Sequence, residues 1–144
     1  MELPSIDHQV YVDAPMELVF KTLTTAAGWD AWFTQGTLLD ARKGGNIRFR
    51  WVNWGPEHVI TEDGGPILEI IPSHKFVFIW QPDEHPTTVS INLSTRGEGT
   101  IVQLQDSGYT TPEVFMYCAA GWGEALTLLK FYLEHNLTYG IVPE

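Results

Sequence analysis

The chain has 144 residues, of which 44% are hydrophobic, and its formal net charge is −10. This length and composition fit a folded domain with a substantial core, so we expect residues 1–144 to form a single domain rather than a disordered chain. The negative charge disfavours polyanionic partners, so we expect neither nucleic acid nor an anionic membrane surface to bind.

The single cysteine, Cys118, excludes a disulfide within the chain, so the cysteine usage does not require an oxidising compartment. The first residues lack the basic start and the apolar run of a signal peptide. No stretch approaches the roughly 20 apolar residues that a membrane span requires. We therefore expect a cytoplasmic protein.

The first part of the chain predicts one strand and two short helices. Ile6–Val12 alternates between apolar and polar residues, as a half-buried strand does. The sequence Asp-Ala-Pro at 13–15 predicts a helix start at Asp13 or Ala14, because proline is well tolerated in a first helical turn. Gly28 interrupts the helical pattern, and a second short helix is expected over 29–33.

From residue 37 to residue 107 the sequence is typical of antiparallel strands separated by turns. Gly44-Gly45 predicts one turn, and the run Asp63–Pro66 predicts another. Phe76–Trp80 is apolar on both faces, which favours a central or covered strand. Strands are expected over 37–41, 46–52, 67–71, 76–80, 87–95 and 100–106, while 58–61 either extends the second of these or begins another.

The last long segment, Thr111–Asn136, predicts a helix that Thr111 caps and that holds Pro112 in its first turn. Its apolar residues recur at steps of three and four and cover more than a third of its circumference. At 1.5 Å per residue it is about 37 Å long, so it needs a large apolar surface to lie against. The expected fold class is α+β, a curved antiparallel sheet of six to seven strands wrapped around this helix.

Residues spread over nearly the whole chain are similar to a known family in type and order. They are Ala14-Pro15, Val19, Trp32-Phe33, Gly44-Gly45, Ile47, Phe49, Phe76, Phe78, Trp80, Gly99-Thr100, Gly121-Trp122, Leu126 and Leu129. In these positions the chain resembles the AHSA1-type branch of the START/Bet v 1 (SRPBCC) superfamily, named for a domain in activators of the Hsp90 ATPase. The resemblance implies the helix-grip fold. Relatives include carriers of hydrophobic ligands, aromatic polyketide cyclases and Hsp90 co-activators.

The candidate binding site is the space between the sheet and the C-terminal helix, toward which many aromatic residues point. A partly open apolar cavity is the usual form of a small-molecule site, and complete filling by these side chains is the alternative. Gly121 and Gly123 each cost the helix about 0.8–1 kcal/mol relative to alanine, which close strand packing or a ligand would explain. The expected ligand-binding residues are Trp32, Phe33, Phe49, Trp51, Phe78, Trp80, Tyr117, Gly121, Trp122 and Ala125.

The sequence predicts no catalytic residues, no metal site and no cofactor. The five histidines show none of the spacings of zinc sites, and no second cysteine joins Cys118. Cys118 lies on the apolar side of the helix, where a small core residue is more common than a reactive thiolate. The polar groups that could reach the cavity as acid or base are Gln103, Gln105, Tyr117, Arg48, Arg50 and Glu69, and alternation places the two arginines outside.

We predict a domain that binds a small apolar or aromatic molecule in this cavity. A cyclase or hydrolase using the same cavity is one alternative, which a buried carboxylate or histidine with a shifted pKa would favour. An Hsp90-associated domain with a chaperone or another protein as partner is the other, which a filled cavity and an exposed apolar patch would favour. Val77 and Ile79, on the face away from the helix, could supply that patch or a dimer interface, so monomer and homodimer both stay open.

Overall fold

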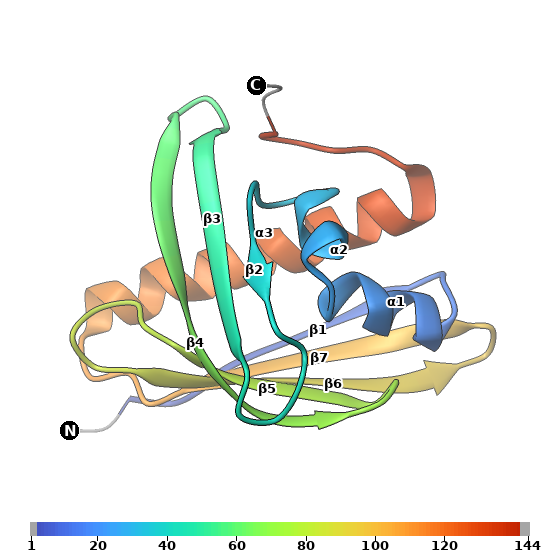
Figure 1. Cartoon of the computed structure of the whole chain (residues 1–144), viewed down its shortest axis with the longest axis horizontal. Helices are drawn as coiled ribbons and strands as arrows, with labels where there is room; N and C mark the ends of the chain where they lie inside the picture. The colour runs from blue at the N-terminus through green and yellow to red at the C-terminus, as the bar shows by residue number, and fades with distance from the viewer. Residues whose placement is uncertain (1–2, 142–144) are drawn as a thin grey trace.

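The computed structural model describes residues 3–141, which form an α+β fold around a seven-stranded antiparallel sheet (Figure 1). Helices α1 (Met16–Leu23) and α2 (Ala26–Asp30) follow the first strand, and the long helix α3 (Pro112–His135) follows the last. The strands are β1 (Ile6–Val12), β2 (Leu38–Leu39), β3 (Asn46–Trp54), β4 (Val59–Ile71), β5 (Lys75–Trp80), β6 (Thr87–Arg96) and β7 (Gly99–Ser107). The element order confirms the predicted fold class.

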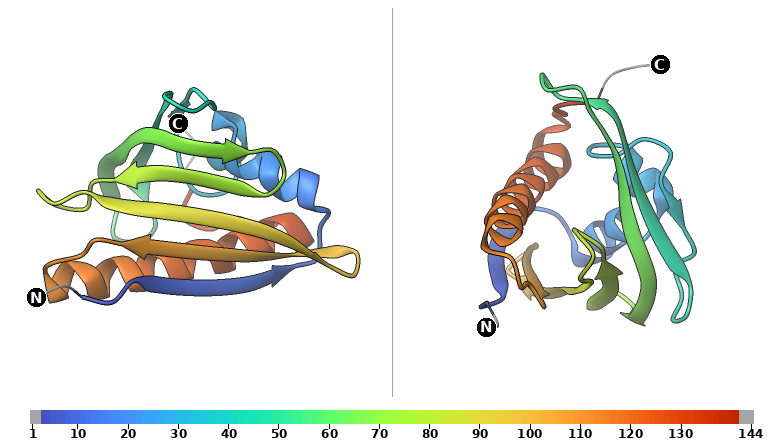
Figure 2. Two further views of the ribbon diagram at one scale, coloured as in Figure 1. Left: turned by 90° about the horizontal axis from the view of Figure 1, so that it is seen from below. Right: turned by 90° about the vertical axis from the view of Figure 1, so that its left-hand side faces the viewer.

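The strands lie in the order β1-β7-β6-β5-β4-β3-β2. The first strand therefore pairs with the last, and the register sets Ile6 opposite Asp106 and Val12 opposite Thr100. The sheet curves around one side of α3 (Figure 2). Among the strands, β1 is the one whose backbone α3 approaches most extensively. Toward β5, the ring of Trp122 on α3 contacts that of Trp80, with the centroids 5.0 Å apart.

Helix α3 turns Trp122, Ala125, Leu126 and Leu129 toward the sheet, where all four are buried. It ends at Asn136, which adopts a left-handed backbone conformation with φ of 54°. Asparagine tolerates this conformation better than most residues do. None of the helices within residues 3–141 has the length and apolar character needed to cross a membrane.

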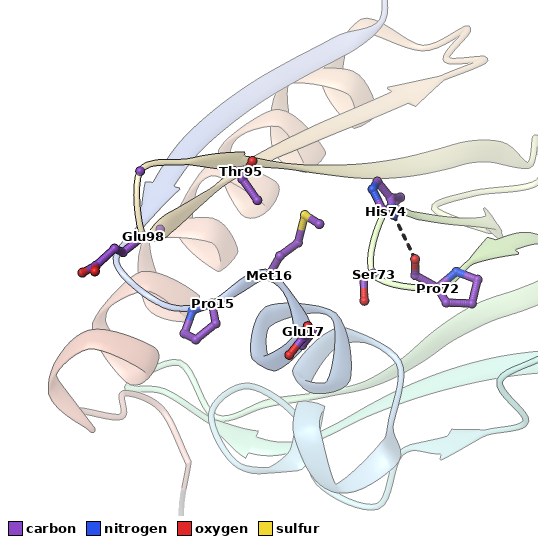
Figure 3. Close-up of a pocket in the computed structure, with 10 residues that line it drawn as sticks. Pro15, Met16, Glu17, Pro72, Ser73, His74, Thr95 and Glu98 are labelled. Atoms are coloured by element: carbon purple, nitrogen blue, oxygen red, sulfur yellow. Dashed lines mark hydrogen bonds between the residues drawn. The ribbon is translucent and has the colours of Figure 1, made fainter.

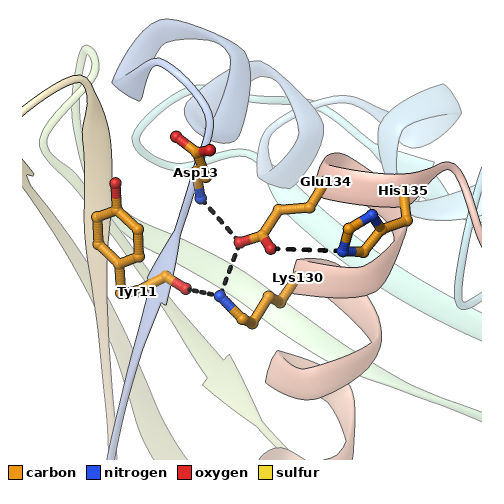
Figure 4. Close-up of polar contacts among 5 residues, drawn as sticks. All are labelled: Tyr11, Asp13, Lys130, Glu134 and His135. Carbon is orange, nitrogen blue, oxygen red and sulfur yellow. Dashed lines mark hydrogen bonds and ion pairs between the residues drawn. The ribbon is translucent and has the colours of Figure 1, made fainter.

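A polar clasp fastens the second half of α3 to the end of β1 (Figure 4). The Lys130 ammonium donates to the Tyr11 carbonyl at 2.7 Å and to Glu134 Oε2 at 2.7 Å. The same Glu134 oxygen accepts from the Asp13 backbone N–H at 2.9 Å. Because the bonds to Tyr11 and Asp13 join α3 to residues far away in the sequence, the clasp fixes where α3 lies along β1.

β4 runs without a break through the segment Asp63–Pro66, so the predicted turn there is wrong. The first half of β4 pairs with β3 and its second half pairs with β5. A side chain at position 64 would collide with the Ile47 backbone, and one at position 65 would press on Ile79. The two glycines therefore let one long strand pass close to both neighbours as it bends between them.

The second short helix begins earlier than predicted, and Gly28 lies inside it. The Thr25 hydroxyl caps this helix by accepting from the Gly28 N–H at 3.0 Å. A side chain at position 28 would collide with the Thr22 carbonyl. Gly28 thus allows α2 to fold back tightly onto the end of α1, where the sequence had suggested an interruption. The predicted strand 37–41 shortens to β2.

Residues 137–141 leave the end of α3 and cross to the tip of the β3–β4 hairpin (Figure 1). The Gly55 N–H donates to the Gly140 carbonyl at 3.0 Å. The Tyr139 ring meets the Trp54 ring edge-on, with the centroids 5.5 Å apart. We call residues 137–141 the C-terminal strap, because they tie the end of the helix to the far side of the sheet.

Candidate functional site

Aromatic side chains from α2, the segment after it, β3, β5 and α3 form one continuous layer in the core. Rings from neighbouring elements contact one another directly: the centroids of Phe33 and Trp51 are 5.4 Å apart, and those of Trp80 and Trp122 are 5.0 Å apart. We call this set the aromatic layer; it consists of Trp29, Trp32, Phe33, Phe49, Trp51, Trp54, Phe78, Trp80 and Trp122.

The structure brings most of the predicted binding residues together. Ala125 is buried on the inward face of α3, beside Trp122 in the helix sequence. The other predicted residues in the interior all belong to the aromatic layer: Trp32, Phe33, Phe49, Trp51, Phe78, Trp80 and Trp122.

Two predicted residues, Tyr117 and Gly121, lie on the outer part of α3. Tyr117 is 77% exposed. A β-carbon at Gly121 would meet no atom within 4 Å, so the expectation that this glycine faces the sheet is wrong. The reason is helical phase, since Gly121 stands about 100° around the helix from the inward-facing Trp122. Gly123 is the glycine in close contact, because a β-carbon there would lie 3.5 Å from His8 Nε2.

Two pockets on the surface lie away from the aromatic layer. One of about 460 Å³ opens between the start of α1, the β4–β5 turn and the β6–β7 hairpin (Figure 3). Met16, His74 and Glu98 are among its lining residues. A second, of about 300 Å³, lies beside His8 and Gln103. Neither is lined by a predicted binding residue, and the layer itself is packed ring against ring.

Three indole groups in the aromatic layer bury an N–H that has no hydrogen-bond partner among the described residues, namely those of Trp32, Trp54 and Trp80. By contrast, Trp29 donates to the Leu23 carbonyl at 2.8 Å. A buried donor without a partner costs about 1–3 kcal/mol. The apolar layer therefore presents several donors to any acceptor that reaches it.

A buried carboxyl group lies at the end of β7, beneath the first half of α3. Asp106 continues the inward-facing row of Val102 and Leu104, and it is 0% exposed. Its Oδ2 accepts from the Tyr109 hydroxyl and from Trp122 Nε1, the latter at 3.0 Å. The Thr87 side chain lies against the same carboxyl and stabilises its ionised form. Tyr109, Trp122 and Thr87 together thus support this carboxyl in the apolar interior.

Two further polar side chains lie next to this carboxyl. The register of β6 and β7 sets Thr87 diagonally across from Asp106 on the inward face, where its buried side chain stabilises the ionised carboxyl. The half-buried Cys118 thiol lies beside the Tyr109 hydroxyl and the Trp80 indole. We call the whole group the Asp106 cluster; it consists of Trp80, Thr87, Asp106, Tyr109, Cys118 and Trp122.

Burial governs protonation in this cluster. It raises the pKa of the Asp106 carboxyl above its ordinary value, while the hydrogen bonds from Tyr109, Thr87 and Trp122 act in the opposite direction. Burial likewise raises the pKa of Tyr109, and the neighbouring carboxylate adds to the effect. Burial also raises the pKa of the Cys118 thiol. Tyr109 and Cys118 are therefore neutral at physiological pH, which disfavours a thiolate nucleophile.

A second carboxyl with a shifted pKa, that of Asp63, lies at the bend of β4. Its Oδ1 accepts from the Gly64 N–H at 2.6 Å and from the Gln81 N–H at 2.9 Å, which ties the bend to the end of β5. Burial raises the pKa of this carboxyl to about 6, and the backbone hydrogen bonds oppose the rise. Asp63 therefore supports the frame of the sheet.

Sequence reasoning missed Asp106, although a signal for it was present. The alternation that placed Val102 and Leu104 inside predicts the same for position 106, two residues further on. Gln103 and Gln105 are exposed, as alternation requires. Val77 is buried, so the exposed patch considered for it and Ile79 does not form. Within residues 3–141 no three histidine, cysteine or acidic side chains are grouped so that they could hold a metal ion.

Known protein families provide independent information on this chain. The model of the AHSA1 family, described as activator of Hsp90 ATPase homolog 1-like protein, matches residues 13–134. The chain belongs to this family. No curated protein matches the AHSA1-like chain significantly.

Several solved structures share the fold of this AHSA1-like chain. The Aha1 dimer from Colwellia psychrerythraea has a TM-score of 0.77 at 24% identity, over 92% of this chain and 98% of that one. A protein from Staphylococcus saprophyticus has a TM-score of 0.77 at 24% identity, over 96% and 97%. CalU16 from Micromonospora echinospora has a TM-score of 0.77 at 26% identity, over 97% and 71%. These likenesses confirm the Bet v 1-like, SRPBCC-type fold.

Proposed function

We propose that this AHSA1-like domain binds a small, predominantly aromatic molecule between the curved sheet and α3. The observation that carries the proposal is the aromatic layer, which combines stacked rings with buried indole N–H groups that lack partners. Small-molecule sites are mostly apolar and hold a few polar groups that orient the ligand. An aromatic ligand bearing a hydrogen-bond acceptor matches both properties.

The side facing β3 and β4 is the expected entrance. Among the described residues, α3 approaches the backbone of β1 most extensively and is held there by the clasp, so the side toward β3 and β4 is the less tightly closed one. Trp51, Trp54 and Trp80 keep exposed fractions of 8–9%. A ligand would enter by moving these rings or the C-terminal strap, while the β1–α3 contact stays intact.

The proposal is tested by titrating ¹⁵N-labelled protein with 2-naphthol, a small fluorescent phenol. The chain has six tryptophans, and each gives one indole N–H signal that a Trp→Phe variant assigns. We expect binding at about −5 to −8 kcal/mol, with the largest shifts at Trp32, Trp54 and Trp80, whose indole N–H groups have no partner among the described residues. Trp29 should shift least, because its N–H already bonds to Leu23.

The matched control for this titration is Gly121→Leu. This substitution adds a large side chain to the outer surface of α3, so binding of 2-naphthol should be unchanged. Shifts confined to residues around the surface pocket near Met16 and His74, or no indole shift up to the solubility limit of the probe, would contradict the proposed site.

Acid catalysis by Asp106 is a second candidate function, favoured by the raised pKa of this buried carboxyl. A substrate contacting Oδ1 could accept its proton. Hydrolysis of 2-naphthyl acetate, followed by the fluorescence of released 2-naphthol, tests this role. An enzyme should lose the reaction in Asp106→Asn, whereas a rate equal to that of buffer alone would exclude hydrolysis of this ester.

The relatives suggest two protein partners to test. The family name points to a chaperone of the Hsp90 class, and the Colwellia neighbour is a dimer. Light scattering on a size-exclusion column separates the 16.3 kDa monomer from a homodimer, and an ATPase assay with Hsp90 tests the chaperone. A single domain over 1–144 and a cytoplasmic location remain predictions.

A further inference from the structure

We propose that the first half of β4 binds an extended, basic segment of another protein, which adds to the sheet as an antiparallel strand. The surface is the side of residues 59–63 that faces away from β3, and we call it the β4 edge. It is distinct from the aromatic layer, so the inference does not depend on the proposed small-molecule ligand. It assigns an interaction surface and the chemistry of the partner that fits it.

The first argument is that this part of β4 pairs on one side only. Residues 59–66 pair with β3, whereas pairing with β5 begins at Ile67. Figure 1 shows the first half of β4 beside β3, rising away from the rest of the sheet. Within residues 3–141 no strand pairs with the β4 edge. An unpaired edge of this kind is a template for an added strand.

The second argument identifies the backbone groups that point outward at the β4 edge. The Ile67 N–H donates to the Gly45 carbonyl, and the Gly44 N–H donates to the Ile67 carbonyl. Both glycines lie just before β3, so the backbone of Ile67 faces the β3 side. Because this direction alternates along a strand, Ile60 and Glu62 face the opposite side. The N–H and C=O groups of these two residues are therefore the ones that an added strand would meet.

The third argument is that Asp63 separates the β4 edge from β5. Gly64 is the next outward-facing residue after Glu62, and its N–H donates to Asp63 Oδ1 at 2.6 Å. The same oxygen accepts from the Gln81 N–H at 2.9 Å, just past the end of β5. The carboxyl thus lies in the fork between the two strands, and β5 does not continue along the β4 edge.

The fourth argument is the negative charge around this edge. Glu62 lies within it, Glu57 lies in the turn before it, and Asp83 and Glu84 lie in the segment that follows β5. The Gln81 N–H bond to Asp63 holds the start of this last segment next to the edge. Acidic groups at both ends and in the middle favour a partner of positive charge.

The two arginines of β3 leave this charge largely uncompensated. Arg48 Nε lies 3.8 Å from Glu62 Oε1, and the Glu62 side chain remains 51% exposed. Arg50 Nη1 instead donates to the Gln35 carbonyl at 3.3 Å. Next to Glu62 on the edge, Ile60 is 72% exposed. A lysine with its apolar stem and charged end suits both neighbours.

The antiparallel geometry sets the pattern of the partner. Residues directly opposite Ile60 and Glu62 have their side chains on the same face and point their own N–H and C=O groups at β4. This is the outer face, because Thr61 lies opposite the buried Trp51 on the inner one. The partner therefore alternates basic residues on the outer face with apolar residues on the inner face. A second copy of β4 would bring further acidic residues to the same edge, which disfavours self-pairing.

The probe is the acetylated and amidated peptide Lys-Val-Lys-Val-Lys-Val, titrated into ¹⁵N-labelled protein. At saturation, hydrogen exchange of the Ile60 and Glu62 amides should slow by about tenfold or more, because the peptide accepts from both N–H groups. The Thr61 amide already faces Trp51 of β3, so its exchange rate should stay unchanged.

Two N-methylated forms of the peptide are the matched controls, since they share its charge and its side chains. Methylation of the lysine nitrogens removes the N–H groups that face β4 and should weaken binding by about tenfold or more. Methylation of the valine nitrogens alters groups that face away from β4, so the affinity should stay close to that of the unmodified peptide.

The matched pair of protein variants is Glu62→Gln and Glu17→Gln. Each removes one exposed carboxylate, the first from the β4 edge and the second from α1. Glu62→Gln should weaken binding of the unmodified peptide by about two- to fivefold, as loss of one exposed charge pair does. Glu17→Gln should leave it unchanged.

Three outcomes would overturn the proposal. Equal binding of the two methylated peptides would show that charge alone holds the peptide, without strand addition. Unchanged exchange of the Ile60 and Glu62 amides up to the solubility limit of the peptide would show that the β4 edge takes no such partner. Exchange that slows with rising protein concentration alone would make a second copy of the chain the occupant.

Discussion

At the scale of single residues, Asp106 stands out because a carboxyl in an apolar core is costly unless its neighbours satisfy it. Tyr109 and Trp122 do so for one oxygen. Thr87, diagonally across on β6, supports the same carboxyl. The position of Asp106 in the core thus depends on side chains from the neighbouring strand, from α3 and from the segment between β7 and α3.

Asp63 gives a pH-dependent prediction at the same scale. Burial raises its pKa from 3.8 to about 6, so between these values the folded chain binds more protons than the unfolded chain. Its contribution to stability is therefore complete below about pH 3.8 and is lost as the pH rises through about 6. Asp63→Asn keeps an Oδ1 acceptor for the Gly64 and Gln81 N–H groups and removes this loss.

The melting temperature of Asp63→Asn relative to the parent should thus increase from about pH 4 to about pH 7 and stay level above that range. Thermal unfolding followed by circular dichroism at several pH values measures the difference. A difference that is the same at all these pH values would mean that the Asp63 carboxyl does not titrate as described.

Which residues turn inward could be predicted from the strands more reliably than from the helix. Alternation placed Phe49, Trp51, Phe78 and Trp80 correctly, because a strand allows only two directions for a side chain. In α3 the apolar residues cover so wide an arc that the boundary between the buried and the exposed face could not be located. Gly121, which lies on the exposed face, was therefore expected on the buried one. Whether the aromatic layer is packed or open could not be predicted, because both arrangements require the same inward-facing aromatics.

At the scale of elements, the two glycines of α3 allow the effect of helix propensity on stability to be measured apart from the effect of packing. Leucine at either position improves helix propensity by up to about 1 kcal/mol. Gly121→Leu projects into open space and should raise stability by roughly this amount. At Gly123 the β-carbon alone reaches 3.5 Å from His8 Nε2, so the rest of a leucine would push α3 off β1 and cost about 1–3 kcal/mol.

Urea unfolding of the two glycine variants measures both effects on one scale. The His8 ring, which is hydrogen-bonded to the Ala119 carbonyl at 2.7 Å, is the contact that distinguishes them. Equal changes in stability for the two variants would show that this contact does not hold α3 against β1.

The C-terminal strap allows a second prediction at this scale. Gly140 has φ of +83° and a side chain there would collide with the Trp54 ring, whereas Gly97 has φ of +60° with no atom near its β-carbon position. Alanine at either position carries the strain of the left-handed region, about 1–2 kcal/mol. Only Gly140→Ala should also detach the strap from Trp54.

Hydrogen exchange of the Gly55 amide reports this detachment, because Gly55 donates to the Gly140 carbonyl. Exchange should accelerate in Gly140→Ala and stay at the parent rate in Gly97→Ala. Equal protection of Gly55 in both variants would show that the strap is held by other contacts.

The bend of β4 shows where prediction of elements from sequence reached its limit. Asp63-Gly64-Gly65-Pro66 has the composition of a turn, and nothing local distinguishes a turn from a bend in a long strand. The difference lies in the partners, since β3 and β5 both pair with this strand and hold it extended. The order and type of the other elements could be predicted because each carries its own periodicity.

At the scale of the whole molecule, the fold is closed by pairing across the chain. β1 pairs with β7, and the clasp joins α3 to the end of β1. These contacts have the greatest sequence separation in the sheet, so the loop-closure entropy that they cost is high. We therefore expect β5, β6 and β7 to associate before β1 during refolding.

Pulse-labelled hydrogen exchange measures this order directly. Amides in the β6–β7 hairpin should become protected in an earlier phase than those of Ile6–Val12. Simultaneous protection of both sets would instead indicate that the sheet forms in a single cooperative step.

The pairing of β1 with β7 also has a consequence for how the chain is synthesised. β1 leaves the ribosome before its partner β7, which is complete only after Ser107 has been added. Until then β1 has no partner strand, and its backbone N–H and C=O groups can form hydrogen bonds with other chains. Its polar side chains, Asp7, His8 and Gln9, interrupt the apolar run that would otherwise favour aggregation in the nascent state. β1 can therefore take its place in the sheet only after translation has passed residue 107.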